Sequence, residues 1–318
     1  MEPVKFNSSI KNVCVKPISF GLGDIVFSLP IIQALIEKKY NTWAVYKNEI
    51  QKDLLFSLPG LSGSISELGL ACLPSNTQLI DLRDHYLQKN YWWGGSSFKA
   101  DYPDFYINDI SKVIASDFGL PFDFENLRPL SFQKINGLNN TIIFIPGSDG
   151  PYKCWLDNYW LELAENLNKI NYNVVVIGQI DSSQAVRNLI AGGLKHEPTP
   201  SIQDAINIIS SCLAVVSIDT GFGHLAVQQG INTVLLLRPD SVFYRPYKHS
   251  AKLNGYACSE ICINNYDDRI ETSLNQNLDT YVGLECKANY RQECMSKITP
   301  EMVISEMKKL FAQNYAKI

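Results

Sequence analysis

The stretch VVSIDTGFGHLAVQQG, residues 215–230, decides the fold that this sequence predicts. It begins with a short β-branched run, continues through a glycine-rich turn and ends with apolar residues at helical spacing. Strands that pass through such turns into helices build doubly wound parallel sheets. Ligands of these sheets bind at the carboxyl ends of the strands, so the turn itself is the first candidate site.

Four residues of this turn have the chemistry of an anion site. They are Asp219, Thr220, Gly221 and His224. Backbone N–H groups, a hydroxyl and the positive end of the following helix together suit a diphosphate. The alternative is an ordinary capped helix, in which Asp219 or Thr220 is the cap and His224 makes a structural hydrogen bond. The residues alone leave both interpretations open.

The same alternation of strand and helix continues outward from this stretch. In the second half of the chain we expect strands at 141–145, 173–178, 213–218 and 233–237, and helices at 157–169, 182–191, 202–211 and 223–229. In the first half we expect strands at 12–18, 43–46 and 78–82, and helices at 24–39 and 103–118. Two such blocks predict an α/β protein with two doubly wound, Rossmann-like domains.

A polar stretch, residues 132–140, separates the two blocks and is the expected hinge. The chain of 318 residues is also long for one compact domain. The predicted domains are therefore 1–135 and 136–299.

A closing helix is expected over 300–316. Thr299 precedes it as a cap, and Pro300 stands at its first position, where proline is favoured. We expect this C-terminal segment, 300–318, to pack back on the first domain.

A second glycine turn, in FGLGDIVFSLP at residues 20–30, follows the first expected strand. It fails as a dinucleotide fingerprint, because valine stands where glycine or alanine is required and no suitable acid follows about 20 residues on. The two glycines, Gly21 and Gly23, would let the backbone come close to a ligand and would hold Asp24 at the edge of the sheet. Alternatively, Asp24 simply caps its helix. Pro30 should kink that helix and free a carbonyl, an irregularity typical of functional sites.

The loop IPGSDGPYKCW, residues 145–155, follows a strand of the second block. Ser148 and Asp149 supply small polar groups, and Lys153 can neutralise a phosphate as a point charge. A solvated surface lysine is the alternative interpretation of Lys153.

Composition narrows the class of protein. The formal net charge is −4 and no basic stripe is present, so a nucleic-acid partner is not expected. The N-terminus has no apolar run typical of a signal peptide, and no stretch reaches the roughly 18 apolar residues of a membrane span. These features predict a soluble cytoplasmic protein.

Four of the eight cysteines are clustered: Cys258, Cys262, Cys286 and Cys294. Four soft ligands would suit a structural zinc or iron ion. Disulfides and free thiols are the alternatives that the loose spacing leaves open.

Taken in order, the motifs resemble glycosyltransferase family 9, the heptosyltransferases of bacterial lipopolysaccharide assembly. The resemblance is carried by Gly23-Asp24-Ile25 with Leu29-Pro30, by Ser148, Asp149, Lys153 and Trp155, by Asp219, Thr220, Gly221, His224, Leu225 and Ala226, and by Cys294 to Glu301. It covers nearly the whole chain. The sequence departs from the family at Leu237-Arg238-Pro239, where the family usually has Phe-Gly-Pro.

The resemblance implies a GT-B fold, in which two Rossmann-like domains face a cleft. The first domain would hold the acceptor near Gly21 and Gly23, and the second would hold a nucleotide-sugar donor, typically ADP-heptose. Asp24 would be the catalytic base of an inverting transfer, and Lys153 would stabilise the leaving diphosphate, so that no metal cofactor is required. The implied donor-binding residues are Ser148, Asp149, Lys153, Asp219, Thr220, Gly221 and His224.

The implied acceptor is a glycan or glycolipid of lipopolysaccharide type, or a protein. Residues 1–140 contain 13 Lys or Arg against 14 Asp or Glu, a balance that suits a weakly charged acceptor. At most peripheral contact with the inner face of the bacterial inner membrane is expected. The rival interpretations are a catalytically silent sugar-binding scaffold with the GT-B fold, and a nucleotide-sugar epimerase or hydrolase.

Overall fold

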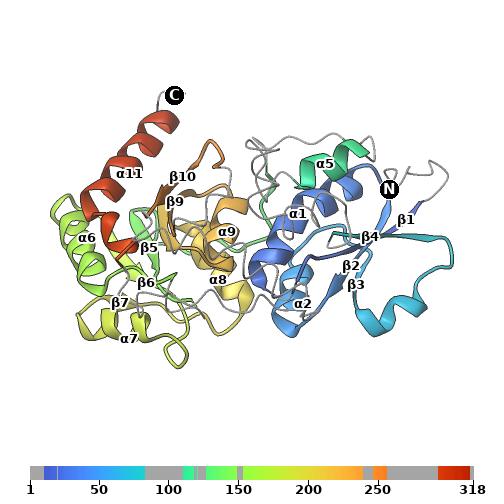
Figure 1. Cartoon of the computed structure of the whole chain (residues 1–318), viewed down its shortest axis with the longest axis horizontal. Helices are drawn as coiled ribbons and strands as arrows, with labels where there is room; N and C mark the ends of the chain where they lie inside the picture. Colours follow the sequence, from blue (N-terminus) through green and yellow to red (C-terminus); the bar gives the residue numbers. More distant parts are fainter. Residues whose placement is uncertain are drawn as a thin grey trace. The chain divides into compact units, whose positions relative to one another are not determined.

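The computed structural model describes residues 11–19, 21–82, 110–117, 120, 127–148, 153–238, 246–255 and 293–315. These residues form two compact units, one reaching Ser131 and the other beginning at Phe132 (Figure 1). Each unit contains its own parallel sheet, so the predicted α/β fold class is confirmed. The boundary lies a few residues before the expected one, 135–136.

The first unit has a four-stranded sheet in the order β3-β2-β1-β4. Its described elements are β1 (Asn12–Lys16), α1 (Leu22–Glu37), β2 (Asn41–Tyr46), α2 (Glu49–Phe56), β3 (Gly63–Ser66), the 3-10 helix η1 (Glu67–Cys72), β4 (Thr77–Asp81) and α5 (Ile110–Asp117). Helix α1 packs on β1 and β2 and contacts both α2 and α5. Strand order reverses between β1 and β4, so this sheet has its topological switch point there.

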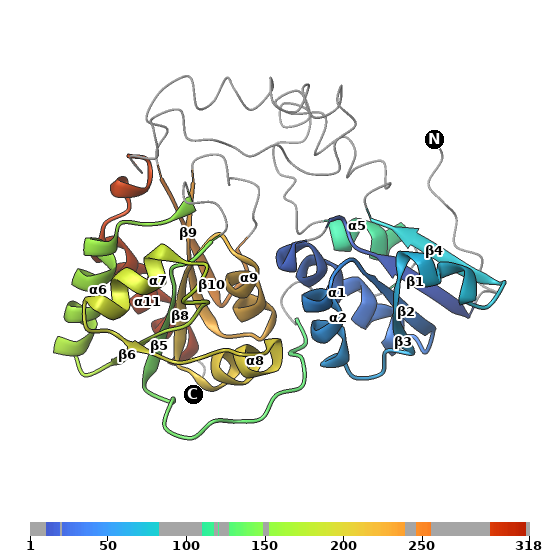
Figure 2. The ribbon, with the colours of Figure 1, turned by 90° about the horizontal axis from the view of Figure 1, so that it is seen from below.

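The second unit has a six-stranded sheet in the order β10-β9-β8-β5-β6-β7. Its described elements are β5 (Thr141–Ile145), α6 (Asp157–Lys169), β6 (Asn173–Val176), α7 (Gln184–Ala191), β7 (Lys195–His196), α8 (Ile202–Ser211), β8 (Ala214–Ile218), α9 (Gly221–Gln228), β9 (Asn232–Leu237), β10 (Ser250–Asn254), the 3-10 helix η4 (Met295–Lys297) and α11 (Pro300–Tyr315). Helices α6, α7 and α11 cover one face of the sheet, and α8 and α9 cover the other (Figure 2). The switch point of this sheet lies between β5 and β8.

Helix α11 corrects the expected domain arrangement. It packs on α6, β9 and β10 of the second unit, whereas we expected it to pack on the first. Val303, Met307 and Leu310 recur at helical spacing and are buried in the core of the second unit. These apolar residues pack α11 against the second unit. Thr299 caps the helix as predicted, because its Oγ1 accepts the Met302 N–H at 3.4 Å.

The elements that the pattern did not predict are short or polar. Helix α2 has the sequence EIQKDLLF and buries only Gln51, Leu54 and Leu55. Strand β7 has only two residues. Strands β3 and β10 lie at the edges of their sheets, and neither contains a run of apolar residues. Hydrophobic periodicity over four to eight residues cannot detect such elements.

The chain passes from one unit to the other at Phe132. The Ser131 N–H donates to the Ser57 carbonyl of the first unit at 3.1 Å. The Gln133 N–H donates to Asn207 Oδ1 of helix α8 at 2.8 Å. The Ile135 N–H likewise donates to Ser211 Oγ at 2.8 Å, so the stretch expected as a hinge is bonded to α8 at two residues. Among the described helices, none is both long and apolar enough to cross a membrane.

Candidate active site

The turn between β8 and α9 brings the predicted anion-site residues to the carboxyl edge of the second sheet. Thr220 is the N-cap, and its Oγ1 accepts the Gly223 N–H at 3.3 Å. Gly221 is the first residue of α9. His224 is buried in the first turn, and its Nε2 lies 3.1 Å from Asp219 Oδ1. The capped-helix interpretation is thus confirmed with Thr220 as the cap. The N-terminus of α9 lies at the carboxyl edge of the sheet, where doubly wound sheets generally bind ligands.

Asp219 is the centre of this arrangement. Its Oδ2 lies 2.9 Å from Lys153 Nζ, and the aspartate side chain is 24% exposed. Burial alone would raise the pKa of Asp219, but the charge of Lys153 and the hydrogen bond from His224 outweigh burial and hold the pKa below its usual range. Asp219 is therefore a fixed anion that anchors both neighbours.

The Lys153–Asp219 pair spans the switch point of the second sheet. Lys153 lies on the connection after β5, and Asp219 directly follows β8. Strands β5 and β8 are neighbours at which the strand order reverses. Lys153 is 29% exposed and paired, so it is not the solvated surface lysine of the alternative interpretation.

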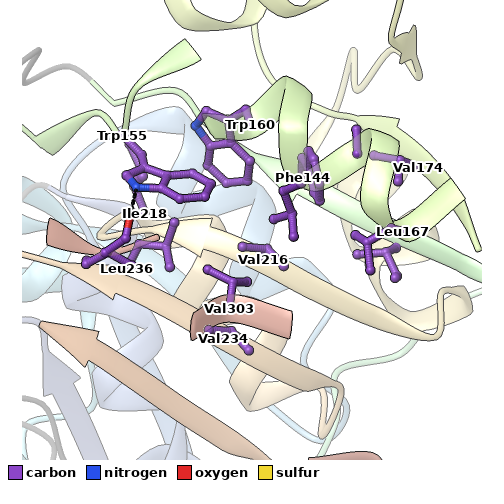
Figure 3. Packing of buried hydrophobic residues seen from close by; sticks show 14 of the residues in the cluster. Phe144, Trp155, Trp160, Leu167, Val174, Val216, Ile218, Val234, Leu236 and Val303 are labelled. Atoms are coloured by element: carbon purple, nitrogen blue, oxygen red, sulfur yellow. Dashed lines mark hydrogen bonds between the residues drawn. The ribbon is translucent and has the colours of Figure 1, made fainter. Parts of the chain in front are cut away.

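Trp155 anchors the segment that carries Lys153. Its side chain is fully buried, and its Nε1 donates to the Ile298 carbonyl at 2.9 Å (Figure 3). Its ring packs edge-on against Trp160, with centroids 5.0 Å apart. The tryptophan of the Lys-x-Trp motif is thus a packing residue that holds the lysine at the sheet edge.

Gly223 explains how α9 comes so close to the sheet. A Cβ atom at this position would lie 2.5 Å from Ser217 Oγ and 3.0 Å from Leu235 Cδ2. Neither distance is compatible with an unshifted side chain. The glycine therefore allows the first turn of α9 to rest on β8 and β9.

Two further residues follow the strands of this edge. Ser148 lies half-buried after β5, and its backbone is hydrogen-bonded to the Cys154 thiol. Arg238 directly follows β9 and is 8% exposed, and its carbonyl accepts the Asn254 Nδ2–H at 3.2 Å. Arg238 adds a cation to the same edge. Asp149 lies outside the described residues.

The Asp24 turn is the corresponding feature of the first unit. Asp24 is half-buried in the first turn of α1, and its Oδ2 accepts the Gly21 N–H at 2.9 Å. The interpretation of Asp24 as a cap is therefore confirmed. A Cβ at Gly21 would lie 2.7 Å from that oxygen, so a side chain there would displace the carboxylate. Gly23 precedes Asp24 in the same turn, and α1 runs through Pro30 without interruption.

Gln51 supports this turn and was missed by the sequence pattern. It is fully buried, and its Nε2 donates to the carbonyls of Ser19 at 3.0 Å and Gly21 at 2.9 Å. Its Oε1 accepts the Lys47 N–H at 2.9 Å. Because Gln51 lies on the unpredicted helix α2, no signal in the sequence pointed to it.

The structure tests only part of the predicted metal site. Cys258, Cys262 and Cys286 lie outside the described residues, whereas Cys294 is buried beside the core of the second unit. The described residues contain no group of three or more His, Cys, Asp or Glu side chains that is arranged to hold a metal ion. The structural zinc or iron ion stays a prediction.

Known proteins share both sequence and fold with this chain. The model of glycosyltransferase family 9 (heptosyltransferase) matches residues 122–271. Lipopolysaccharide heptosyltransferase 2 of Salmonella typhimurium is 24% identical over 263 residues, which are 74% of this chain and 71% of that protein.

Two solved structures extend the likeness over the whole fold. The structure of glycosyltransferase family 9 from Veillonella parvula superposes on this chain with a TM-score of 0.68 at 15% sequence identity. The match includes 98% of this chain and 99% of the Veillonella parvula chain. The structure of ADP-heptose lipopolysaccharide heptosyltransferase II of Escherichia coli superposes with a TM-score of 0.65 at 16% sequence identity. The match includes 96% of this chain and 99% of the Escherichia coli chain. These likenesses confirm the GT-B fold. The chain is thus similar to glycosyltransferase family 9 in sequence over residues 122–271 and to solved heptosyltransferases in fold.

Proposed function

We propose that this protein transfers a heptose from ADP-heptose, or a sugar from a related nucleoside-diphosphate sugar, to a hydroxyl of a lipopolysaccharide-type acceptor. The observation that carries the proposal is the Lys153–Asp219–His224 constellation beside the capped N-terminus of α9. A lysine, a helix N-terminus and a histidine are groups that bind a diphosphate. The relatives named above supply the sugar, the nucleotide and the acceptor class.

In this proposal the second unit holds the donor. The Lys153 ammonium lies 2.9 Å from Asp219 Oδ2 at the edge of the sheet, and a lysine in this position can neutralise a phosphate as a point charge. The N–H groups at the start of α9 point along the helix axis toward the same edge. Together they would stabilise the negative charge that develops on the leaving diphosphate.

The first unit would supply the base. The acceptor hydroxyl oxygen bonds to the anomeric carbon, the bond from that carbon to the diphosphate oxygen breaks, and the hydroxyl proton passes to Asp24. Attack opposite the leaving group inverts the anomeric configuration. The Gly21 N–H, 2.9 Å from Asp24 Oδ2, orients the carboxylate for this role.

We further propose that the transfer needs no metal ion, because Lys153 and the α9 N-terminus carry the positive charge that a divalent cation would otherwise supply. The reaction would take place at the inner face of the bacterial inner membrane, with the protein at most peripherally bound. A glycan acceptor is favoured over a protein acceptor, since the relatives are named for lipopolysaccharide.

The substitution Asp24→Asn tests the proposal. Asparagine keeps an oxygen that accepts the Gly21 N–H but cannot take a proton. We expect the rate of heptose transfer to fall at least about 100-fold, the usual contribution of a general base. Binding of ADP-heptose, measured by calorimetry, should be unchanged because the donor lies in the other unit.

Asp204→Asn is the matched control. Asp204 is likewise the third residue of a helix and accepts the Ser201 N–H at 3.1 Å, but it caps α8. We expect normal transfer from this variant. Transfer by Asp24→Asn above about a tenth of the wild-type rate would show that Asp24 is not the base. Failure of the wild-type protein to bind ADP-heptose or any other nucleotide sugar would favour a silent scaffold.

A further inference from the structure

Two asparagine–glycine dipeptides occur in the chain, and the structure places them in opposite environments. They are Asn136-Gly137 and Asn254-Gly255. At such a dipeptide the amide nitrogen of the glycine can attack the carboxamide of the asparagine, and glycine favours the attack because it has no side chain to hinder it. The two sites have the same reacting groups, so any difference in their reactivity comes from the fold.

Asn136-Gly137 lies in an exposed turn. Both residues are exposed, and Gly137 has a φ of +89°, in the left-handed region that favours glycine. A Cβ added at Gly137 would meet no atom within 4 Å. The side chain of Asn136 therefore has room to rotate toward the amide nitrogen that follows it.

The backbone on either side of this turn is anchored. Before the turn, the Ile135 N–H donates to Ser211 Oγ at 2.8 Å, and after it Leu138 is buried. Within the part of the chain that the structure describes, no hydrogen bond holds the Gly137 N–H or the Asn136 carboxamide. Both reacting groups at this site are thus open to solvent.

Asn254-Gly255 lies at the end of β10, where both of its reacting groups are bonded. Asn254 Nδ2 donates to the Arg238 carbonyl at 3.2 Å, and the Gly255 N–H donates to the Leu237 carbonyl at 2.8 Å. Gly255 is buried, and a Cβ there would collide with the backbone carbonyl of Cys294. The carboxamide cannot reach the glycine nitrogen unless this end of β10 first opens.

We infer that Asn136 is a site of spontaneous deamidation in the folded protein and that Asn254 is protected from it. After the Gly137 N–H loses its proton to a base in solvent, its nitrogen bonds to Asn136 Cγ. The bond from Cγ to Nδ2 breaks, and the amide group takes up a proton from water and leaves as ammonia. Water then opens the resulting cyclic imide at one of its two carbonyls, which gives aspartate or isoaspartate.

The modification changes the segment that leads into β5. Either product adds a negative charge at residue 136, and isoaspartate also lengthens the backbone by one methylene group between Ile135 and Gly137. The inference does not rest on the proposed function, because Asn136 is not among the residues assigned to donor, acceptor or catalysis. We therefore expect Asn136→Asp, which imitates one product, to transfer sugar at the wild-type rate.

Peptide mapping of the wild-type protein by mass spectrometry tests the inference. The native protein is incubated at pH 8, and the fraction of each dipeptide in which OH has replaced NH₂ is followed over time. We expect Asn136 to deamidate at least about tenfold faster than Asn254, because two hydrogen bonds must first open at Asn254. The rate at Asn136 should rise with pH, since the attacking nitrogen must lose its proton.

The unfolded chain is the matched control. In concentrated guanidinium chloride Asn136 and Asn254 should deamidate at similar rates, because the fold no longer protects either site. Asn136→Gln should abolish the fast reaction in the native protein and leave the slow reaction at Asn254 unchanged, since glutamine would have to close a larger ring.

Two results would overturn the inference. One is an equal rate at Asn136 and Asn254 in the native protein, which would mean that the hydrogen bonds of Asn254-Gly255 give no protection. The other is a native protein in which Asn136 stays intact although it reacts in guanidinium chloride. That result would show that the folded turn keeps the carboxamide away from the Gly137 nitrogen.

Discussion

At the scale of single residues, Asp219 makes the most specific electrostatic prediction. Its folded-state pKa is held below the ordinary value of 3.8, so its ionised form stabilises the fold above that pH. The stabilisation is lost as the pH falls below about 4, where the unfolded chain takes up the proton first. We expect Asp219→Asn to lower the free energy of unfolding by about 1–3 kcal/mol at pH 7, because Lys153 loses its carboxylate partner.

Urea unfolding of both proteins at pH 7 and at pH 3 measures this effect. The difference in the free energy of unfolding between wild type and variant should narrow at pH 3. Glu165→Gln, which breaks the exposed Lys169–Glu165 pair on α6, should cause no measurable change at either pH. An equal difference at both pH values would mean that the charge of Asp219 does not stabilise the fold.

Residues within one turn could be predicted from the sequence, and their distant partners could not. Asp219, Thr220 and His224 stand in a single strand–turn–helix stretch, so spacing alone brought them together. Lys153 was a candidate by charge, but its contact with Asp219 depends on β5 and β8 being neighbours in the sheet. The ion pairs that Lys16 forms with Glu67 and Asp81 were not predicted, because strand pairing brings together residues that are distant in sequence.

At the scale of elements, the packing of α9 on the sheet depends on one glycine. Gly223→Ala would place a Cβ 2.5 Å from Ser217 Oγ, so α9 must shift away from β8. We expect the variant to lose about 1–3 kcal/mol of stability, the usual cost of overpacking a well-packed site. Urea unfolding measures the loss, and Ser217→Ala in the same protein should restore part of it.

The double variant makes this prediction specific. If the clash with Ser217 is the cause, the two substitutions should be coupled by about 0.5 kcal/mol or more, since residues in contact are not additive. Additive losses would mean that alanine destabilises α9 for another reason, such as a changed Thr220 cap. Strands β5 and β8 were predicted well because they are fully buried and mostly apolar.

Elements with mixed composition were the ones that could not be predicted. Helix α2 buries one polar and two apolar residues, and β10 has the sequence SAKLN. Their positions are set by contacts with neighbouring elements, and a local pattern carries no information on those contacts. The placement of α11 was wrong for the same reason: its apolar stripe predicts a buried face but not which unit covers it.

At the scale of the whole molecule, each unit buries hydrophobic residues of its own in the part of the chain that the structure describes. The buried cluster around Trp155 and Trp160 contains residues of the second unit alone, including Val303 and Met307 of α11. In the first unit, α1 packs against the sheet with its own buried residues, Ile25, Leu29 and Ile32 among them. Units with their own cores can unfold in separate steps.

We therefore expect two calorimetric unfolding transitions, each responding to one substrate. ADP-heptose at 100 times its dissociation constant should stabilise the second unit by about 2.7 kcal/mol and raise only that transition. A core oligosaccharide of the proposed acceptor should raise only the transition of the first unit. Asp219→Asn should lower the transition that ADP-heptose raises. A single transition that both ligands raise would contradict the independence of the units. A donor that raised only the transition unaffected by Asp219→Asn would reverse the assignment of donor and acceptor to the two units.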